Sequence, residues 1–239
     1  MKTKSTIAIA TTLLICVSVF LTGCDEMISG SGRISSETRE VSSFDAIEIS
    51  GAFHVYLIQG NNESLVIEAD DNLLQYIESG VRGGRLYIEP RAFSFRNPTL
   101  KAYITFRDLD EIRASGAVKI TGETSLEFGR LLISTSGASD IDLELYGERL
   151  ELKVSGAGKT HIDGEVEKTI IRLSGASKLN AESLYVEKMD INISGAGSAN
   201  VRVEDELVAN ISGAGNIRYI GDPRVHSKVS GAGNVKRLK

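Results

Sequence analysis

The tripeptide Ser-Gly-Ala recurs along this chain at nearly constant intervals, and no other feature of the sequence constrains the fold as strongly. Its serines are separated by 65 residues and then by 21, 19, 19, 20, 18 and 18 residues. A unit of this length cannot bury a hydrophobic core alone, so successive units must stack on one another. The serines are Ser50, Ser115, Ser136, Ser155, Ser174, Ser194, Ser212 and Ser230.

The residues before these serines alternate between polar and apolar, as in Lys153-Val154 and Arg172-Leu173. This alternation predicts a strand with one buried face. The glycine supplies a backbone conformation that a Cβ atom would resist, and the alanine suits a tight inside corner. We therefore expect an all-β, parallel β-helix (β-solenoid) with coils of about 18–21 residues, with the serines stacked as a structural hydroxyl ladder. The repeat glycines are Gly51, Gly116, Gly137, Gly156, Gly175, Gly195, Gly213 and Gly231.

The opening interval of 65 residues corresponds to about three coils without the motif, apart from a degenerate Ser79-Gly80. Within and before it, residues 44–60, 65–73 and 84–88 read FDAIEISGAFHVYLIQG, LVIEADDNL and GRLYI. Together with the downstream repeats, these segments resemble the bacterial family described as "putative auto-transporter adhesin, head GIN domain", over about residues 44–235. The resemblance implies a right-handed β-solenoid, often on a lipoprotein or secreted chain, with no established activity. The adhesin label rests on fold analogy, and no catalytic residue can be carried over from it.

The N-terminus has the layout of a secretory signal. A basic start is followed by the apolar run Ile7–Phe20, which is short for a membrane span, and then by Leu21-Thr22-Gly23-Cys24. The ending is similar to a bacterial lipobox, so we expect a lipoprotein signal peptide over 1–23, with Cys24 as the lipidation site and the anchor to a membrane. The alternative is an ordinary secretory signal with an incidental cysteine. We expect a flexible tether over 24–43 and the β-solenoid domain over 44–239.

Charge and cysteine content narrow the function further. The net charge is −5, and cleavage would remove Lys2 and Lys4 and leave −7, which is the opposite of what a nucleic-acid-binding protein shows. Cys16 lies within the signal, so the folded part has no cysteine for disulfides, thiolate metal sites or nucleophilic catalysis.

The sequence contains no arrangement of residues that predicts a cofactor, a metal site or a catalytic residue. The histidines, His54, His161 and His226, occupy different phases of the coil and should not converge. The fifth position of the repeat is polar but mixed in sign, and we expect Asp140 to form a cross-coil salt bridge with its lysine neighbours. Asp142 and Glu144 alternate with it and could share a face, but without a second set of carboxylates a calcium site is disfavoured. The fifth-position residues are Lys119, Asp140, Lys159, Lys178, Ser198, Asn216 and Asn234.

One loop breaks the pattern and is the candidate binding loop. Residues 91–99 place two aromatics between two arginines, namely Arg91, Phe93, Phe95 and Arg96. Such a loop suits ligand binding or self-association. The alternative is that both phenylalanines fold over the side or end of the solenoid. Tyr76 and Tyr87 remain as sugar-stacking candidates in a chain that lacks tryptophan.

These observations favour a cell-envelope protein, lipid-anchored to a bacterial membrane, with the outer membrane preferred and the protein facing the periplasm or the cell surface. We expect a non-catalytic adhesion, binding or structural module whose partners are a surface glycan, a protein or a second copy. The alternative is a carbohydrate-active solenoid, a pectinase-like polysaccharide lyase or hydrolase. Two or more carboxylates in one groove with an arginine or lysine would favour that alternative.

Overall fold

The computed structural model describes residues 27–91 and 94–238, and about three quarters of these residues lie in β-strands. The signal peptide, Cys24 and Phe93 lie outside the described residues. The helical structure within the described ranges is one short 3-10 turn, η2 (Leu74–Tyr76). Over the same ranges, no helix has the length and apolar character needed to cross a membrane.

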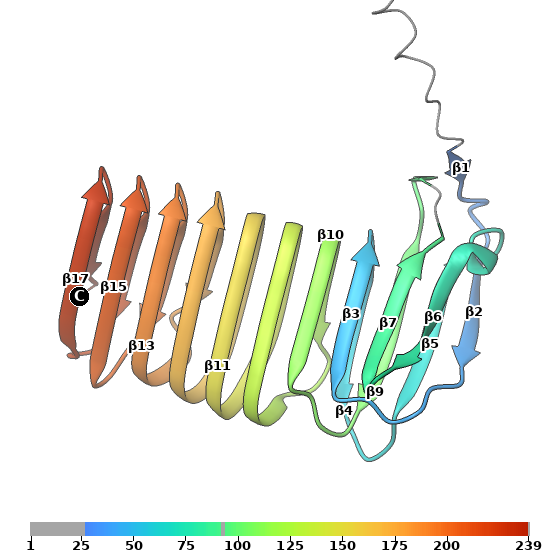
Figure 1. Cartoon of the computed structure of the whole chain (residues 1–239), viewed down its shortest axis with the longest axis horizontal. Coiled ribbons are helices and arrows are strands. Elements are labelled where there is room, and N and C mark those ends of the chain that lie inside the picture. The colour runs from blue at the N-terminus through green and yellow to red at the C-terminus, as the bar shows by residue number, and fades with distance from the viewer. Residues whose placement is uncertain (1–26, 92–93, 239) are drawn as a thin grey trace, which may run out of the picture.

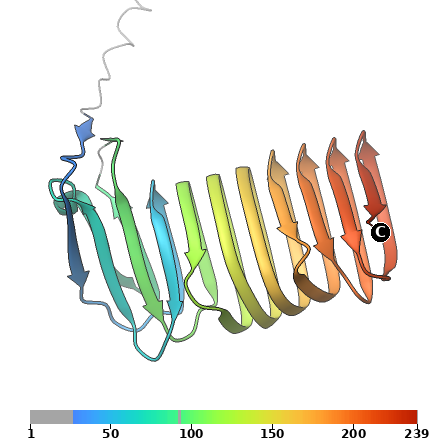
Figure 2. The same ribbon diagram turned by 180° about the vertical axis from the view of Figure 1, so that it is seen from behind.

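The chain winds as a flattened parallel solenoid with two faces (Figures 1 and 2). In each coil that carries the Ser-Gly-Ala motif, a strand of the first face leads to the motif at the corner, and a strand of the second face leads away from it. The continuous strands β10 (Glu111–Gly122) and β11 (Leu126–Gly175) pass through corners without a break. The other first-face strands are β3 (Ala46–Gly51), β7 (Arg85–Pro90), β13 (Leu184–Gly195), β15 (Glu206–Gly213) and β17 (Arg224–Gly231). The other second-face strands are β4 (His54–Gln59), β9 (Leu100–Phe106), β12 (Lys178–Ala181), β14 (Ser198–Arg202), β16 (Asn216–Ile220) and β18 (Asn234–Arg237).

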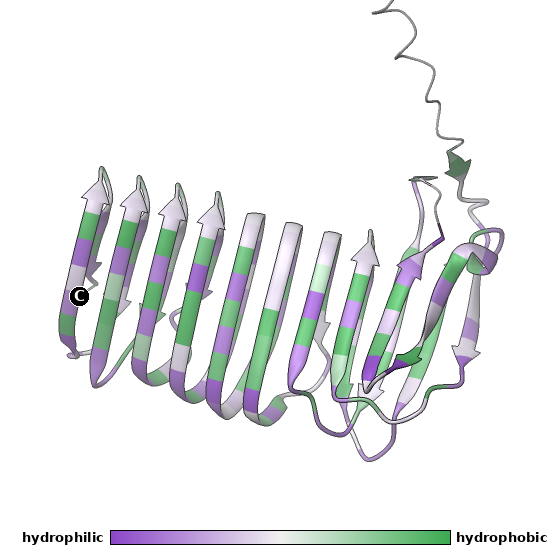
Figure 3. Cartoon of the chain, in the orientation of Figure 1, coloured by the Kyte–Doolittle hydropathy of each residue, from purple (hydrophilic) through white to green (hydrophobic). Residues whose placement is uncertain are grey.

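The core lies between the two faces and follows the alternation in the sequence. Ile191, Ile193, Ala209 and Ile211 are at most 2% exposed, while the residues between them face outward. Parallel register places equivalent residues of successive coils side by side, so that Ile193 lies beside Ile211. Figure 3 shows hydrophobic and hydrophilic residues alternating along the strands. The predicted β-solenoid is therefore confirmed.

The repeat glycines are architectural. All eight have positive φ, between 91° and 122°, a region that residues with a Cβ atom rarely adopt. A Cβ atom built on Gly175 would lie 2.5 Å from the carbonyl oxygen of Gly156 in the preceding coil. The corner therefore requires glycine twice over, for its backbone conformation and for the close stacking of the coils.

The serines and alanines of the motif do not occupy the expected inner corner. Because the residue before each serine points into the core, the serine itself points outward, and the motif alanines are exposed as well. Ser50 and Ser115 bring their Oγ atoms within 3.0 Å, but the six later motif serines make no side-chain hydrogen bond. The predicted hydroxyl ladder is wrong beyond that first pair. The buried position is instead the fourth of the motif, which holds Ser139 and Ser177 in two coils and glycine in several others.

The 65-residue interval is an excursion rather than three ordinary coils. Ser115 lies directly beside Ser50, so the coil of β3 and β4 stacks on β10. Between them the chain runs to the N-terminal end of the rod. There β7 and β9 add one more parallel layer, and β5 (Ser64–Asp70) and β6 (Ile77–Arg82) close the two faces as antiparallel strands. Ser79-Gly80 lies within β6, where the side chain of Tyr87 covers Gly80, and it is not a degenerate corner.

The segment expected as a flexible tether is partly structured. Strand β2 (Ile34–Arg39) pairs antiparallel with β5, and β1 (Ile28–Ser29) pairs with β8 (Phe95–Arg96). Strand β2 has no apolar alternation. Its Ser35, Glu37 and Arg39 lie opposite core residues of β5, but they are polar because β2 is the last strand of the sheet, at the end of the rod. Polar residues that point inward on an edge strand discourage pairing with another sheet.

The C-terminal end of the rod is charged. Val229 is 42% exposed, whereas its neighbour in register, Ile211, is 2% exposed. Arg237 lies beside Tyr219 in register and forms an ion pair with Asp222 at 3.0 Å. The last coil therefore closes the rod with charged groups on an otherwise open edge.

Candidate functional site

The outward side chains of the second face form a row along the rod. Strand register places Lys119 beside Asp140 and Lys159 beside Lys178, and continues through Ser198, Asn216 and Asn234. The fifth-position residues are thus brought together as the sequence predicts. We call Lys119, Asp140, Lys159 and Lys178 the charged row.

The charged row is unpaired. Asp140 makes no ion pair with Lys119 or Lys159, so the predicted cross-coil salt bridge is wrong. All four side chains are exposed, and hydration of exposed charges offsets most of what pairing would contribute. Many other cations on the described surface are paired, for example Arg172 with Glu151 and Arg107 with Glu63. The charged row therefore presents four unpaired charges to the solvent or to a ligand on the second face.

Two shallow hollows meet at the charged row. The first, of about 460 Å³, lies between the row and the motif alanines, and the methyl groups of Ala138 and Ala157 form part of its floor. The second, of about 560 Å³, extends across the face to Asp142, His161 and Arg218. As expected, Asp140, Asp142 and Glu144 are exposed on one face, with buried residues between them. Two of these carboxylates share the second hollow with three lysines.

An aromatic stack continues the second face toward the N-terminal end. The rings of Tyr56 and Tyr103 are 4.6 Å apart and nearly parallel, and His54 stacks on Tyr56 at 4.1 Å. Burial lowers the pKa of His54, and the nearby Lys119 and Lys101 lower it further. The Nε2 atom of His54 lies 3.1 Å from the hydroxyl oxygen of Thr121, and its Nδ1 atom lies 3.1 Å from the hydroxyl oxygen of Tyr56. Because these rings cover one another, the stack stiffens the sheet and offers little free ring face to a sugar.

Sequence reasoning missed this stack. Tyr56 follows Ser50 by six residues, as Thr121 follows Ser115, so its outward position could have been deduced from the repeat. Tyr103 follows no Ser-Gly-Ala motif, and only the register of β9 with β4 reveals its place.

Two residues of the candidate binding loop, Phe95 and Arg91, already make contacts within the protein. Phe95 is half-buried and packs against the hydrophobic core, as the alternative interpretation predicts. Arg91 donates a hydrogen bond of 2.5 Å from its Nε atom to Glu78, and Arg96 remains exposed. Tyr87 holds the guanidinium of Arg82 over its ring at 4.1 Å, so one face of this sugar-stacking candidate is covered.

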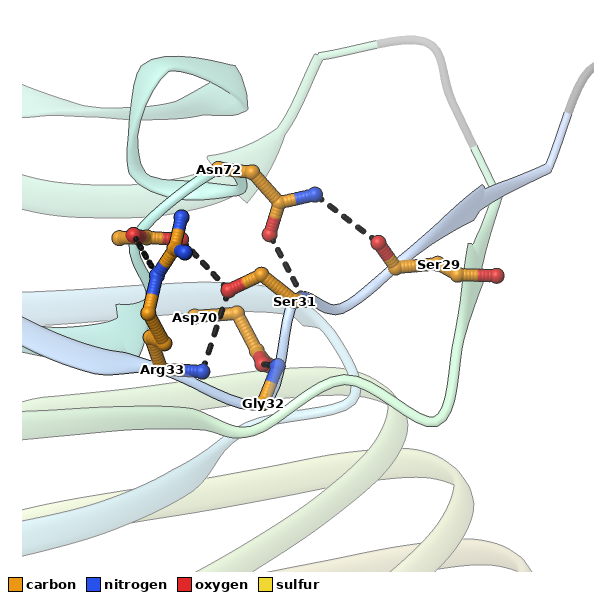
Figure 4. Close-up of polar contacts among 7 residues, drawn as sticks. Ser29, Ser31, Gly32, Arg33, Asp70 and Asn72 are labelled. Carbon is orange, nitrogen blue, oxygen red and sulfur yellow. Dashed lines mark hydrogen bonds and ion pairs between the residues drawn. The ribbon is translucent and has the colours of Figure 1, made fainter.

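A polar clamp fixes the first described residues to the body of the protein (Figure 4). The buried carboxylate of Asp70 accepts hydrogen bonds from the backbone N–H groups of Gly32, at 2.7 Å, and of Thr99, at 2.8 Å. Ser31 donates to Asp71, and its backbone N–H donates to the side chain of Asn72. A Cβ atom on Gly30 would clash with Asp70, which explains the glycine there. The clamp joins the N-terminal segment and the candidate loop at one end of the rod.

The three histidines do not converge. His161 lies 3.2 Å from Asp163, His226 is exposed on the first face, and His54 belongs to the aromatic stack. Within residues 27–91 and 94–238, no three His, Cys, Asp or Glu side chains gather in a way that could hold a metal ion.

The fold agrees with comparisons to known proteins. The model of the family described as "putative auto-transporter adhesin, head GIN domain" matches residues 43–223, so the chain belongs to that family. None of the curated proteins matches the sequence.

Solved structures share the fold. A "putative adhesin" from Bacteroides fragilis is 22% identical with a TM-score of 0.84, covering 88% of this chain and 100% of that one. A "putative adhesin" from Parabacteroides merdae is 23% identical with a TM-score of 0.71, covering 89% of this chain and 99% of that one. A "putative lipid binding protein" from Parabacteroides distasonis is 23% identical with a TM-score of 0.73, covering 90% of this chain and 100% of that one.

Proposed function

We propose that this protein is a lipid-anchored module of the bacterial cell envelope that serves adhesion or binding and is not an enzyme. The observation that carries the proposal is the charged row, in which four exposed charges without ion pairs lie over two hollows. Free charges on a rigid, repetitive face suit recognition of an extended ligand, because the β-solenoid already holds the spacing of the strands that carry them and only the side chains are ordered on binding. The adhesin description of the family and of its structural neighbours supports the same conclusion.

The anchor in this proposal is Cys24, placed by the sequence Leu21-Thr22-Gly23-Cys24, and the outer membrane is the proposed location. The full chain and its Cys24→Ala variant should be compared by cell fractionation and by mass spectrometry of the N-terminal peptide. The expected result is an acylated Cys24 in the membrane fraction, and a variant that is soluble or unprocessed. Unchanged processing and fractionation of the variant would contradict the anchor.

A second candidate function is glycan cleavage, and one observation favours it. Asp140 and Asp142 share the second hollow with Lys159, and a carboxylate or amine placed beside a sugar can act as a general acid or base. The test is whether new chain ends appear when the protein is incubated with polysaccharides. Cleavage that disappears in Asp140→Asn or Asp142→Asn would establish the enzyme and refute the non-catalytic proposal.

A further inference from the structure

We propose that the charged row binds an anionic polysaccharide that lies across the coils, along the axis of the rod. The inference rests on the proposed function of the protein as a non-catalytic binding module, and it names the chemical class of the ligand. It follows from the sign, the spacing and the surroundings of the side chains on the second face.

The net charge of the second hollow is opposite in sign to that of the whole chain. The second hollow is lined by Lys119, Lys159, Lys178 and Arg218 against Asp140 and Asp142, which is four positive and two negative charges, or a net charge of +2 with His161 neutral. The whole chain carries −5. None of these cations forms an ion pair, so their field is available to a ligand.

A third hollow shows that positive and negative side chains gather at different places on the surface. The hollow at the opposite edge of the coils, of about 430 Å³, is lined by acidic residues and by two exposed tyrosines. A polyanion would be repelled by this acidic hollow and attracted to the charged row, so these two hollows favour ligands of opposite sign. The acidic residues are Glu148, Glu165, Glu167, Glu187 and Glu204.

The spacing of the row suits a polymer better than a small anion. Lys159 and Lys178 are direct neighbours in register, so their strands are about 4.8 Å apart, and Lys119 lies two coils from Lys159. Like charges that face each other across adjacent strands are destabilising, and no nearby acid relieves this pair through an ion pair. A ligand with a negative charge on each repeating unit would neutralise the lysines in sequence.

The surroundings favour a polysaccharide over a nucleic acid. The floor beside the row is made of alanine methyl groups and glycine, on which a sugar chain can lie closely. Binding to single-stranded nucleic acid relies on exposed aromatic faces that stack with bases, whereas Tyr56 and Tyr103 cover one another.

The test uses the mature lipoprotein in detergent micelles, with polygalacturonate as the anionic probe and its fully methyl-esterified form as the neutral one. Binding should require the free carboxylates and weaken as salt rises, since exposed charges are screened. The variant Lys119→Gln/Lys159→Gln/Lys178→Gln should lose about tenfold or more in affinity, equivalent to about 1.4 kcal/mol. Asp140→Asn should bind about two- to fivefold more tightly, because it removes the one negative charge within the row.

The matched control is Lys188→Gln/Arg224→Gln/Lys228→Gln, which removes three cations at positions away from the second face. It should stay within about twofold of the wild type. An equal loss in both triple variants, equal binding of the methyl ester, stronger binding of single-stranded DNA, or no binding of polygalacturonate at low salt would each overturn the proposal. Cleavage of the probe would instead refute the non-catalytic function, so the two failures are distinguishable.

Discussion

Replacing Gly175 with alanine tests the corner of the solenoid directly. Gly175 has φ of +91°, which costs a residue with a Cβ atom about 1–2 kcal/mol. The new Cβ atom would lie 2.5 Å from the carbonyl oxygen of Gly156, which also accepts the backbone N–H of Ala176 at 2.9 Å. Displacing that oxygen costs about 1 kcal/mol more for the weakened hydrogen bond. We expect a total loss of about 2–3 kcal/mol, with Gly175→Val costing more because its side chain is branched.

The assay is thermal unfolding followed by circular dichroism. For a protein of this size, such a loss corresponds to a melting temperature lower by about 4–12 °C. Gly129→Ala is the matched control, because Gly129 is exposed, has no atom within 4 Å of its Cβ position and does not have positive φ. Ser174→Ala should change stability by less than about 0.5 kcal/mol, since the hydroxyl is exposed and unbonded. If Gly175→Ala melted like Gly129→Ala, the argument from stacked corners would be refuted.

Three other changes test the remaining contacts. Asp70→Ala removes a buried acceptor of two backbone N–H groups, so it should cost about 2–3 kcal/mol and speed hydrogen exchange at residues 30–33 and 97–99. Phe95→Ala should cost about 1–2 kcal/mol in chemical denaturation, less than a fully buried phenylalanine, because Phe95 is half-buried. The pKa of Glu151 is lowered by its hydrogen bond with Lys153 and by that with Arg172, so its contribution to stability is present above its ordinary pKa near 4.5. Glu151→Gln should therefore destabilise at pH 7, with the difference from wild type vanishing as the pH falls through the lowered pKa.

Each of these expectations has a contrary result. Unchanged exchange at residues 30–33 in Asp70→Ala would mean that the clamp does not hold the N-terminal segment. A Phe95→Ala variant that keeps full stability but loses ligand binding or self-association would restore the binding hypothesis for the loop. A Glu151→Gln difference that stays the same from pH 7 down to the pH at which the carboxylate is protonated would exclude the carboxylate as its cause.

The regular coils could be predicted from the sequence because their information is local. Alternation fixes which side chains enter the core, and the glycine spacing fixes where each coil turns. The adjacency of Ser50 and Ser115 could not be predicted in this way, since it depends on how the intervening strands fold back at the end of the rod. Strand β2 could not be predicted from the sequence either, because Ser35, Glu37 and Arg39 show no apolar pattern and form a strand only by pairing with β5.

The site was predictable in part for the same reason. Equal offsets from the motif serines place Lys119, Asp140, Lys159 and Lys178 in one row. Their pairing was not predictable, because whether neighbouring exposed charges touch depends on side-chain geometry and hydration rather than on register. The outward direction of the motif serines follows from the buried residue before each of them, which shows that the alternation should have been carried through the corner.

The most direct test of the proposed function is a panel of immobilised and soluble polysaccharides probed with the purified mature protein for both binding and cleavage. If the protein is a non-catalytic module that binds polyanions, immobilised anionic polysaccharides should retain it until salt releases it, and the chain lengths of soluble ones should stay unchanged after long incubation. Shortened chains, or retention that is indifferent to the charge of the polysaccharide, would contradict it.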